Sequence, residues 1–201
     1  GKPMIMSTGM ANEEEIGDAI KCARDNGCDE LVVLHCISAY PAPIEQSNLA
    51  TIKSIADKFN CVVGLSDHTL GTVVSVAAIC QGASLIEKHV TLNREEKGAD
   101  SEFSLEPDEL ELLCKDAEAA WKAIGRVSFE RKPVEEASAK FRRSIYFVRD
   151  LEAGQVISEE DIRRIRPGFG LAPKYYDDLI GRKVKYKIER GTATGWDLID
   201  E

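Results

Sequence analysis

The chain has 201 residues, of which 43% are hydrophobic and 30% charged, and its formal net charge is −9. This balance is typical of a folded globular protein, and no apolar run approaches the roughly 20 residues of a membrane-spanning helix. An acidic chain also lacks the basic surface that nucleic acid requires. We therefore expect neither a nucleic-acid partner nor a membrane partner.

The first part of the chain alternates between short apolar runs and stretches with helical periodicity. Strands are predicted at 4–6, 31–34, 62–65 and 85–89, and helices at 13–26, 49–59, 72–81 and 107–124. Asn12, followed by three glutamates, predicts the start of the first helix, and Gly27 predicts its end. Pro107 and Gly125 mark the ends of the last helix. Strands that alternate with helices over short connections predict parallel α/β units.

The character of the sequence changes after residue 125. Residues 126–140 are polar, which predicts a linker between a first domain at 1–125 and a second domain at 141–201. The second domain begins with a strand-like run at 144–148 and continues through segments rich in turn residues. Short strands between glycine and proline turns predict a small β-rich domain.

The six cysteines indicate neither a zinc site nor a disulfide framework, because none stands in a Cys-x-x-Cys pair. Most of them lie within apolar segments, which predicts small buried side chains with free thiols. Free thiols are typical of a reducing compartment, and we therefore expect a cytoplasmic protein.

The three histidines of the chain all follow apolar runs that are predicted to be strands. They are His35, His68 and His89. In parallel α/β folds, functional sites gather at the carboxyl ends of the strands. Because neutral imidazole is the commonest metal ligand in proteins, the repeated position predicts a functional, metal-binding role. The alternative for any one of them is a structural histidine that is hydrogen-bonded within the core.

The alternation of side chains along a strand refines this prediction. Residues two apart share a face, so Ser66 lies with His68, and Glu87 lies with His89. If both faces line one cavity, two imidazoles, a carboxylate and a hydroxyl converge there, which suits a divalent transition metal such as Mn²⁺. The alternative for Glu87 is a salt bridge with Lys88 or with an outer helix.

Two loops next to the predicted strand ends carry further candidate groups. Asp100, in Gly98-Ala99-Asp100-Ser101, offers a carboxylate that can hydrogen-bond a sugar hydroxyl, although the segment also fits a plain turn before a helix. Tyr40 lies in a loop that Pro41 and Pro43 stiffen, where it can be presented to a ligand.

Taken together, these motifs resemble the sialic acid synthase family, which covers N-acetylneuraminate, legionaminate and pseudaminate synthases. The resemblance covers nearly the whole chain and is carried by Ser7-Thr8-Gly9-Met10, Leu34-His35-Cys36, Tyr40-Pro41-Ala42-Pro43, Gly64-Leu65-Ser66-Asp67-His68-Thr69, Glu87-Lys88-His89, Gly98-Ala99-Asp100-Ser101, Ser104-Leu105-Glu106-Pro107 and Arg166-Pro167-Gly168. It implies a (β/α)₈ TIM barrel followed by a small antifreeze-like SAF domain of the β-clip type.

The resemblance also implies how much of that fold this chain holds. Residues 1–125 are similar to the last four βα units of the barrel, and residues 141–201 are similar to the SAF domain. Four units leave open sheet edges and cannot close the barrel. We therefore expect a fragment that lacks a catalytic glutamate and several phosphoenolpyruvate-binding lysines of the first four units.

A role for each candidate residue follows from the resemblance. His68 and His89 match the metal-binding histidines, with Mn²⁺ expected and Mg²⁺ or Co²⁺ as alternatives. Ser7, Ser38 and Ser66 match positions that contact phosphoenolpyruvate, whereas Tyr40 and Asp100 match positions near the amino-sugar. Glu87 matches a carboxylate close to the metal, and Glu87 and Asp100 are the expected catalytic residues. Arg166 matches an arginine that reaches the partner subunit's active site, which implies a domain-swapped homodimer.

The implied reaction condenses phosphoenolpyruvate with an open-chain acylamino-sugar and water, and it releases phosphate. Segments 38–44, 100–105 and 141–146 are most similar to the pseudaminate branch, whose sugar is 2,4-diacetamido-2,4,6-trideoxy-L-altrose. His35 is more typical of the neuraminate branch, so N-acetylneuraminate and legionaminate synthases are alternatives. An alternative of another class is a non-catalytic carbohydrate-binding or assembly module.

Overall fold

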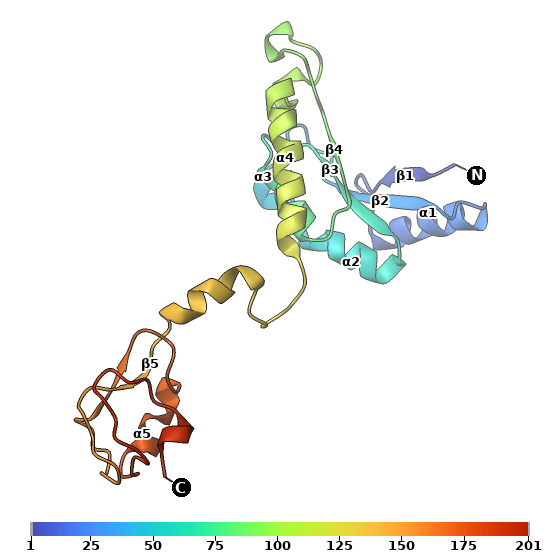
Figure 1. Cartoon of the computed structure of the whole chain (residues 1–201). Helices are drawn as coiled ribbons and strands as arrows, with labels where there is room; N and C mark the ends of the chain where they lie inside the picture. Colours follow the sequence, from blue (N-terminus) through green and yellow to red (C-terminus); the bar gives the residue numbers. More distant parts are fainter. Residues whose placement is uncertain (1, 201) are drawn as a thin grey trace. The chain divides into compact units, whose positions relative to one another are not determined.

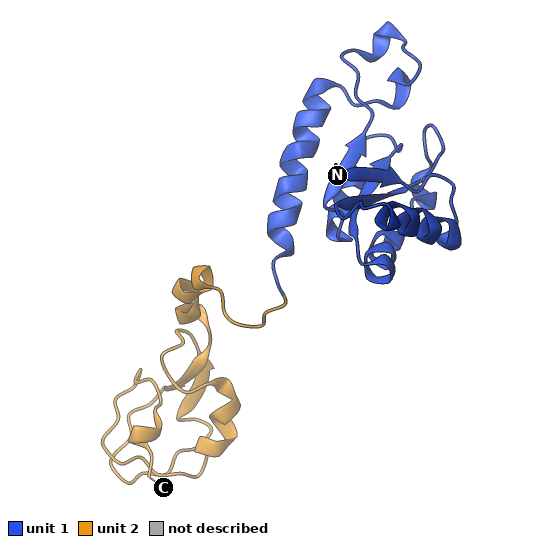
Figure 2. Cartoon of the chain, turned by 90° about the vertical axis from the view of Figure 1, so that its right-hand side faces the viewer, with its two compact units in different colours: residues 1–126 blue, residues 127–201 orange. Residues whose placement is uncertain are grey.

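The computed structural model of the chain describes residues 2–200, and the chain divides between Arg126 and Val127 into two compact units (Figure 2). The first unit is a four-stranded sheet with helices in its crossovers (Figure 1). Its strands are β1 (Met4–Ser7), β2 (Leu31–Cys36), β3 (Val62–Asp67) and β4 (Leu85–Lys88), and its α-helices are α1 (Glu13–Asp25), α2 (Ala50–Phe59), α3 (Val73–Cys80) and α4 (Pro107–Ile124).

All the strand pairs of this sheet are parallel, and the strands follow one another in chain order. A strand and the helix that follows it make one βα unit, and four such units in sequence form half the wall of a (β/α)₈ barrel. The predicted α/β half-barrel is therefore confirmed.

The predicted helix boundaries are confirmed by their caps. At the start of α1, the Asn12 side chain accepts a hydrogen bond from the Glu15 N–H at 3.0 Å, and the Glu15 carboxylate accepts the Asn12 N–H at 2.8 Å. This reciprocal capping box satisfies two amides that the helix leaves unpaired. Pro107 is the first residue of α4, and Gly125 follows its last residue.

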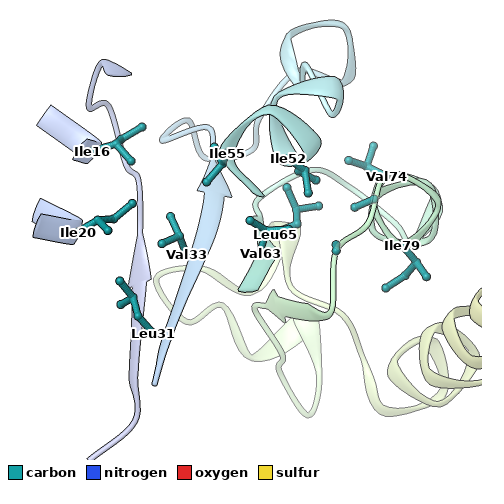
Figure 3. Close-up of a cluster of buried hydrophobic side chains, with 12 residues drawn as sticks. Ile16, Ile20, Leu31, Val33, Ile52, Ile55, Val63, Leu65, Val74 and Ile79 are labelled. Atoms are coloured by element: carbon teal, nitrogen blue, oxygen red, sulfur yellow. The ribbon is translucent and has the colours of Figure 1, made fainter. Parts of the chain in front are cut away.

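One face of the sheet, which we call the helix face, carries the core of the first unit (Figure 3). The strand residues that it buries are Leu31 and Val33 of β2 and Val63 and Leu65 of β3, and the helices add Ile16, Ile20, Ile52, Ile55, Val74, Ala78 and Ile79. The alternate residues of each strand point to the opposite side, which we call the inner face. They include Ser7, Leu34, Cys36, Gly64, Ser66 and Glu87.

The second unit is a small β-rich fold. Strand β5 (Ser144–Phe147) pairs antiparallel with β6 (Ile162–Ile165), and a short helix, α5, spans Tyr176–Leu179. The apolar core of this unit is separate and contains Ile145, Phe147, Leu151, Ile157, Ile162, Leu179, Val184, Ile188 and Ile199. The segment predicted as a polar linker holds a 3₁₀ helix at Pro133–Phe141, none of whose residues is buried.

The six cysteines are free, as predicted, but the predicted burial is wrong for most of them. Cys22, Cys80 and Cys114 are exposed, and only Cys36 is buried. The exposed cysteines belong to α1, α3 and α4, where isoleucine, valine and leucine occupy the core positions instead.

Candidate active site

The two histidines predicted to bind metal come together at the ends of neighbouring strands. His68 directly follows β3 and His89 directly follows β4, and their ring centroids lie 5.3 Å apart. Two residues earlier on the same strands, the Ser66 hydroxyl donates a hydrogen bond to Glu87 Oε1 at 2.7 Å. The inner face thus gathers two imidazoles, a hydroxyl and a carboxylate at one edge of the sheet, as strand alternation predicts.

The His68 ring is held with one nitrogen free. Its Nδ1 lies 3.0 Å from the carbonyl oxygen of Ile37, the residue after β2. A carbonyl can only accept, so Nδ1 carries the proton and Nε2 carries the lone pair. This arrangement, in which a backbone carbonyl fixes the tautomer and the other nitrogen binds the ion, is the usual one for metal-ligating histidines.

A carboxylate also lies beside the His89 ring. His89 Nδ1 lies 3.4 Å from Asp100 Oδ2, in the loop that follows β4. Within residues 2–200, the Nε2 atoms of His68 and His89 have no hydrogen-bond partner in the protein. The described residues contain no group of three or more His, Cys, Asp or Glu side chains that could hold a metal alone. Two free Nε2 atoms nevertheless fit a divalent ion that takes its remaining ligands from water and substrate.

Two aromatic side chains enclose the imidazoles. The Tyr40 ring lies 4.2 Å from the His68 ring and 5.7 Å from the Phe103 ring, and Phe103 lies 5.0 Å from His89. Phe103 is buried, whereas Tyr40 is 58% exposed, so its ring can contact a ligand. The sequence does not mark Phe103 as a site residue, because its only signal is its place between Asp100 and Leu105.

The serines predicted to contact phosphoenolpyruvate lie at three successive strand ends. Ser7 is the last residue of β1, Ser38 follows β2, and Ser66 lies near the end of β3. The Thr8 hydroxyl accepts the Cys36 N–H at 3.0 Å and thereby joins the ends of β1 and β2.

His35 does not belong to this site, and its predicted functional role is wrong. It pairs with Leu65 in the sheet and therefore points to the helix face. Its Nε2 donates a hydrogen bond to the Ser47 carbonyl oxygen at 2.8 Å, and the side chain is buried. His35 is a structural histidine that fixes the loop before α2.

Arg166 lies in the second unit, on the loop that follows β6, and is exposed. The Ser144 hydroxyl donates to the Pro167 carbonyl oxygen at 2.7 Å and accepts the Gly170 N–H at 2.9 Å, so this loop is tied to β5. A Cβ at Gly170 would lie 2.2 Å from the Ile145 carbonyl oxygen, so only glycine fits there. The role of Arg166 at a partner's active site stays a prediction.

No helix within residues 2–200 is both long enough and apolar enough to cross a membrane.

Comparison with known proteins places these features in a family. The NeuB family profile matches residues 1–129, and the SAF domain profile matches residues 142–199. A pseudaminic acid synthase of Campylobacter jejuni is 40% identical over 96% of this chain and 56% of its own length. An N,N'-diacetyllegionaminic acid synthase of Legionella pneumophila is 38% identical over 98% of this chain and 57% of its own length. The chain thus spans less than three fifths of these relatives.

Solved structures agree with this assignment. The spore coat polysaccharide biosynthesis protein SpsE of Bacillus subtilis matches all of this chain over 62% of its own, with a TM-score of 0.59 and 32% identity. An N-acetylneuraminic acid synthetase of Leptospira borgpetersenii, solved with citrate, matches 68% of this chain and 47% of its own, with a TM-score of 0.63 and 33% identity. The fold is the C-terminal half of a (β/α)₈ barrel followed by a SAF domain, and the chain belongs to the NeuB family.

Proposed function

We propose that this chain supplies the metal-binding and sugar-binding half of the active site of a phosphoenolpyruvate-dependent nonulosonic acid synthase. In the proposed reaction, C3 of phosphoenolpyruvate attacks the aldehyde of an open-chain acylamino-sugar, water adds at C2, and the C–O bond to phosphate breaks. The products are a nonulosonic acid and inorganic phosphate.

The observation that carries the proposal is the oriented pair His68 and His89. His68 Nδ1 is hydrogen-bonded to the Ile37 carbonyl oxygen and His89 Nδ1 faces the Asp100 carboxylate, so that Nε2 of each ring is left for an ion. A divalent metal bound there, for which we propose Mn²⁺, would act as a Lewis acid toward the aldehyde oxygen.

The neighbouring side chains supply binding and proton transfer. One carboxylate oxygen of Asp100 lies beside His89 Nδ1, and the other can accept a hydrogen bond from a sugar hydroxyl, next to the exposed ring of Tyr40. Glu87 and Asp100 are the carboxylates that can hold or release a proton beside the imidazoles. Holding the sugar against these groups raises its effective concentration in the correct orientation.

We propose that the hydroxyls of Ser7, Ser38 and Ser66 bind the anionic phosphoenolpyruvate by hydrogen bonds to its carboxylate and phosphate oxygens. These three serines form a series along the carboxyl edge of the sheet. The cationic groups that complete the binding of phosphate would come from the other four βα units.

For the sugar, we propose 2,4-diacetamido-2,4,6-trideoxy-L-altrose, which makes the product pseudaminic acid. The segments 38–44 and 100–105 support this choice, and they contribute Tyr40 and Phe103 to the wall beside the histidines. The test is a phosphate-release assay with this sugar, the legionaminate precursor and N-acetylmannosamine. The chain is joined for this assay to the first four βα units of the Campylobacter relative. Turnover of N-acetylmannosamine alone would contradict the choice.

We also propose a domain-swapped homodimer in which Arg166 enters the partner's active site. The support is an exposed arginine on a loop that is tied to the SAF core. Light scattering on the joined protein should give the mass of two chains. A strictly monomeric mass with full activity would contradict this proposal.

The metal site itself is tested on the 201-residue chain by calorimetric titration with Mn²⁺ and Co²⁺. The double variant His68→Ala/His89→Ala should abolish binding. The matched control is His35→Gln, because glutamine keeps a donor for the Ser47 carbonyl, and this variant should bind metal like the wild type. Equal binding by the double variant would remove the basis of the synthase proposal and favour a non-catalytic binding or assembly module.

A further inference from the structure

Directly behind the two imidazoles, a buried ion pair joins β3 to β4. Lys88 Nζ lies 3.0 Å from Asp67 Oδ2, and the two side chains are only 3% and 1% exposed. Asp67 immediately precedes His68, and Lys88 immediately precedes His89. Because neighbouring residues on a strand point to opposite sides, the pair lies on the helix face while the histidines point to the inner face.

This pair is the centre of a larger network around His68. Asp67 Oδ1 accepts both the N–H and the hydroxyl of Thr69 at 2.8 Å, and Asp67 Oδ2 also accepts the Ser75 hydroxyl of α3. Lys88 donates in addition to the Thr69 carbonyl oxygen. The residues on both sides of His68 are therefore bound to the residue that precedes His89.

Packing alone does not account for charges at this place. Taking two ions out of water is costly, and well-packed apolar side chains of similar volume are often at least as stabilising. The neighbouring helix-face positions on the same two strands are Val63, Leu65 and Ile86, which are apolar. Ionic hydrogen bonds have a property that these residues lack, since they fix atoms at defined distances and angles.

We infer that Asp67 and Lys88 are positioning residues for the metal site, which clamp the ends of β3 and β4 so that His68 and His89 keep the spacing and orientation that an ion requires. This inference rests on the proposed metal-binding function. Groups that hydrogen-bond to metal ligands typically change metal affinity about 10- to 100-fold when they are removed. Asp67 and Lys88 act through the strand ends and not through a bond to either ring, so an effect at the lower end of this range, about 10-fold, is expected here.

The test compares three variants of the 201-residue chain with the wild type. Lys88→Met removes the ammonium group and keeps an unbranched apolar stem. Ser75→Ala removes one hydrogen bond to Asp67 and is the milder change. Val63→Ala is the control, because it removes buried volume from the same face of β3 without touching the clamp. The measurements are the Co²⁺ dissociation constant, the visible absorption spectrum of bound Co²⁺, and the melting temperature.

We expect Lys88→Met to weaken Co²⁺ binding about 10-fold and to shift the spectrum, and Ser75→Ala to weaken binding by a smaller factor. Val63→Ala should bind within about twofold of the wild type in spite of a lower melting temperature. If Lys88→Met does not fold, Ser75→Ala against Val63→Ala decides the question.

Two results would overturn the clamp. One is unchanged Co²⁺ affinity in both clamp variants, and the other is an equal loss in the clamp variants and in Val63→Ala, which would show a merely structural role. Failure of the synthase proposal gives a different pattern, because the wild type itself would then bind no metal through His68 and His89.

Discussion

The two faces of the four-stranded sheet arise from the same alternation of side chains along the strands, but they serve different purposes. On the helix face, Val33, Val63 and Leu65 are buried beneath three helices. On the inner face, Ile5 and Val62 are 55% and 51% exposed, and Leu34 in the middle of the sheet is buried. The stability of the first unit therefore resides mainly on the helix face, whereas the groups for binding and chemistry stand on the inner face. Substitutions on the two faces should separate these properties.

The largest loss of stability is expected at Gly64. This residue belongs to the inner face, but there is no room for a side chain next to its Cα atom. A Cβ added there would lie 2.3 Å from the Leu85 carbonyl oxygen and 2.5 Å from Leu34 Cδ2. Gly64→Ala should force β3 and β4 apart and lower the free energy of unfolding by about 3 kcal/mol or more. Urea unfolding followed by circular dichroism measures the loss. A change below about 1 kcal/mol would show that the strands yield easily at this point.

A closely matched pair of substitutions compares how much the two faces contribute to the free energy of unfolding. Val62→Ala and Val63→Ala remove the same atoms from adjacent residues of β3. Val63 is 4% exposed, and its truncation should cost about 2 kcal/mol, whereas the half-exposed Val62 should cost about 0.5 kcal/mol or less. The same urea unfolding experiment applies. Equal losses would mean that the inner face contributes as much to stability as the helix face.

Much of this fold follows from local signals in the sequence. The caps at Asn12 and Gly125 predict helix ends because they satisfy or terminate backbone hydrogen bonds within a few residues. The apolar runs predict β3 and β4, and strand alternation predicts that His68 and His89 share the inner face with Ser66.

What could not be predicted depends on contacts between distant segments. His35 also stands near a strand end, but β2 continues to Cys36, and this register turns the histidine toward the helix face. The pairing of Asp67 with Lys88 joins residues 21 positions apart, and no periodicity in the sequence reveals it. The aromatic contact of Phe103 with His89 depends likewise on how a loop returns over the site.

A smaller effect is expected from Asp100, the outer partner of His89. Asp100→Ala removes the carboxylate beside the ring, and it should weaken Co²⁺ binding about 10-fold while the exposed position leaves the melting temperature within a few degrees of the wild type. Calorimetric titration and thermal unfolding measure the two quantities. A matched control is Asp108→Ala, an exposed acidic residue of the first turn of α4. An equal loss of Co²⁺ affinity in both variants would show that Asp100 acts only through its negative charge and not through its position beside His89.

The smallest effect concerns a thiol at the edge of the helix-face core. Burial raises the pKa of the Cys61 thiol, and the charge of Arg24 lowers that pKa to a lesser extent. A raised pKa leaves less thiolate near pH 8, and the thiolate is the species that reacts with iodoacetamide. Cys61 should therefore be alkylated more slowly than the exposed Cys80 and Cys114, and the difference should narrow as the pH rises.

Peptide mass spectrometry after timed labelling measures these rates, and labelling in urea provides the control, because unfolding should make all the thiols react alike. If Cys61 reacted as fast as Cys114 in the folded protein, the start of β3 would be open to solvent. The boundary that we draw between a protected helix face and an accessible inner face would then have to move toward the interior of the strand.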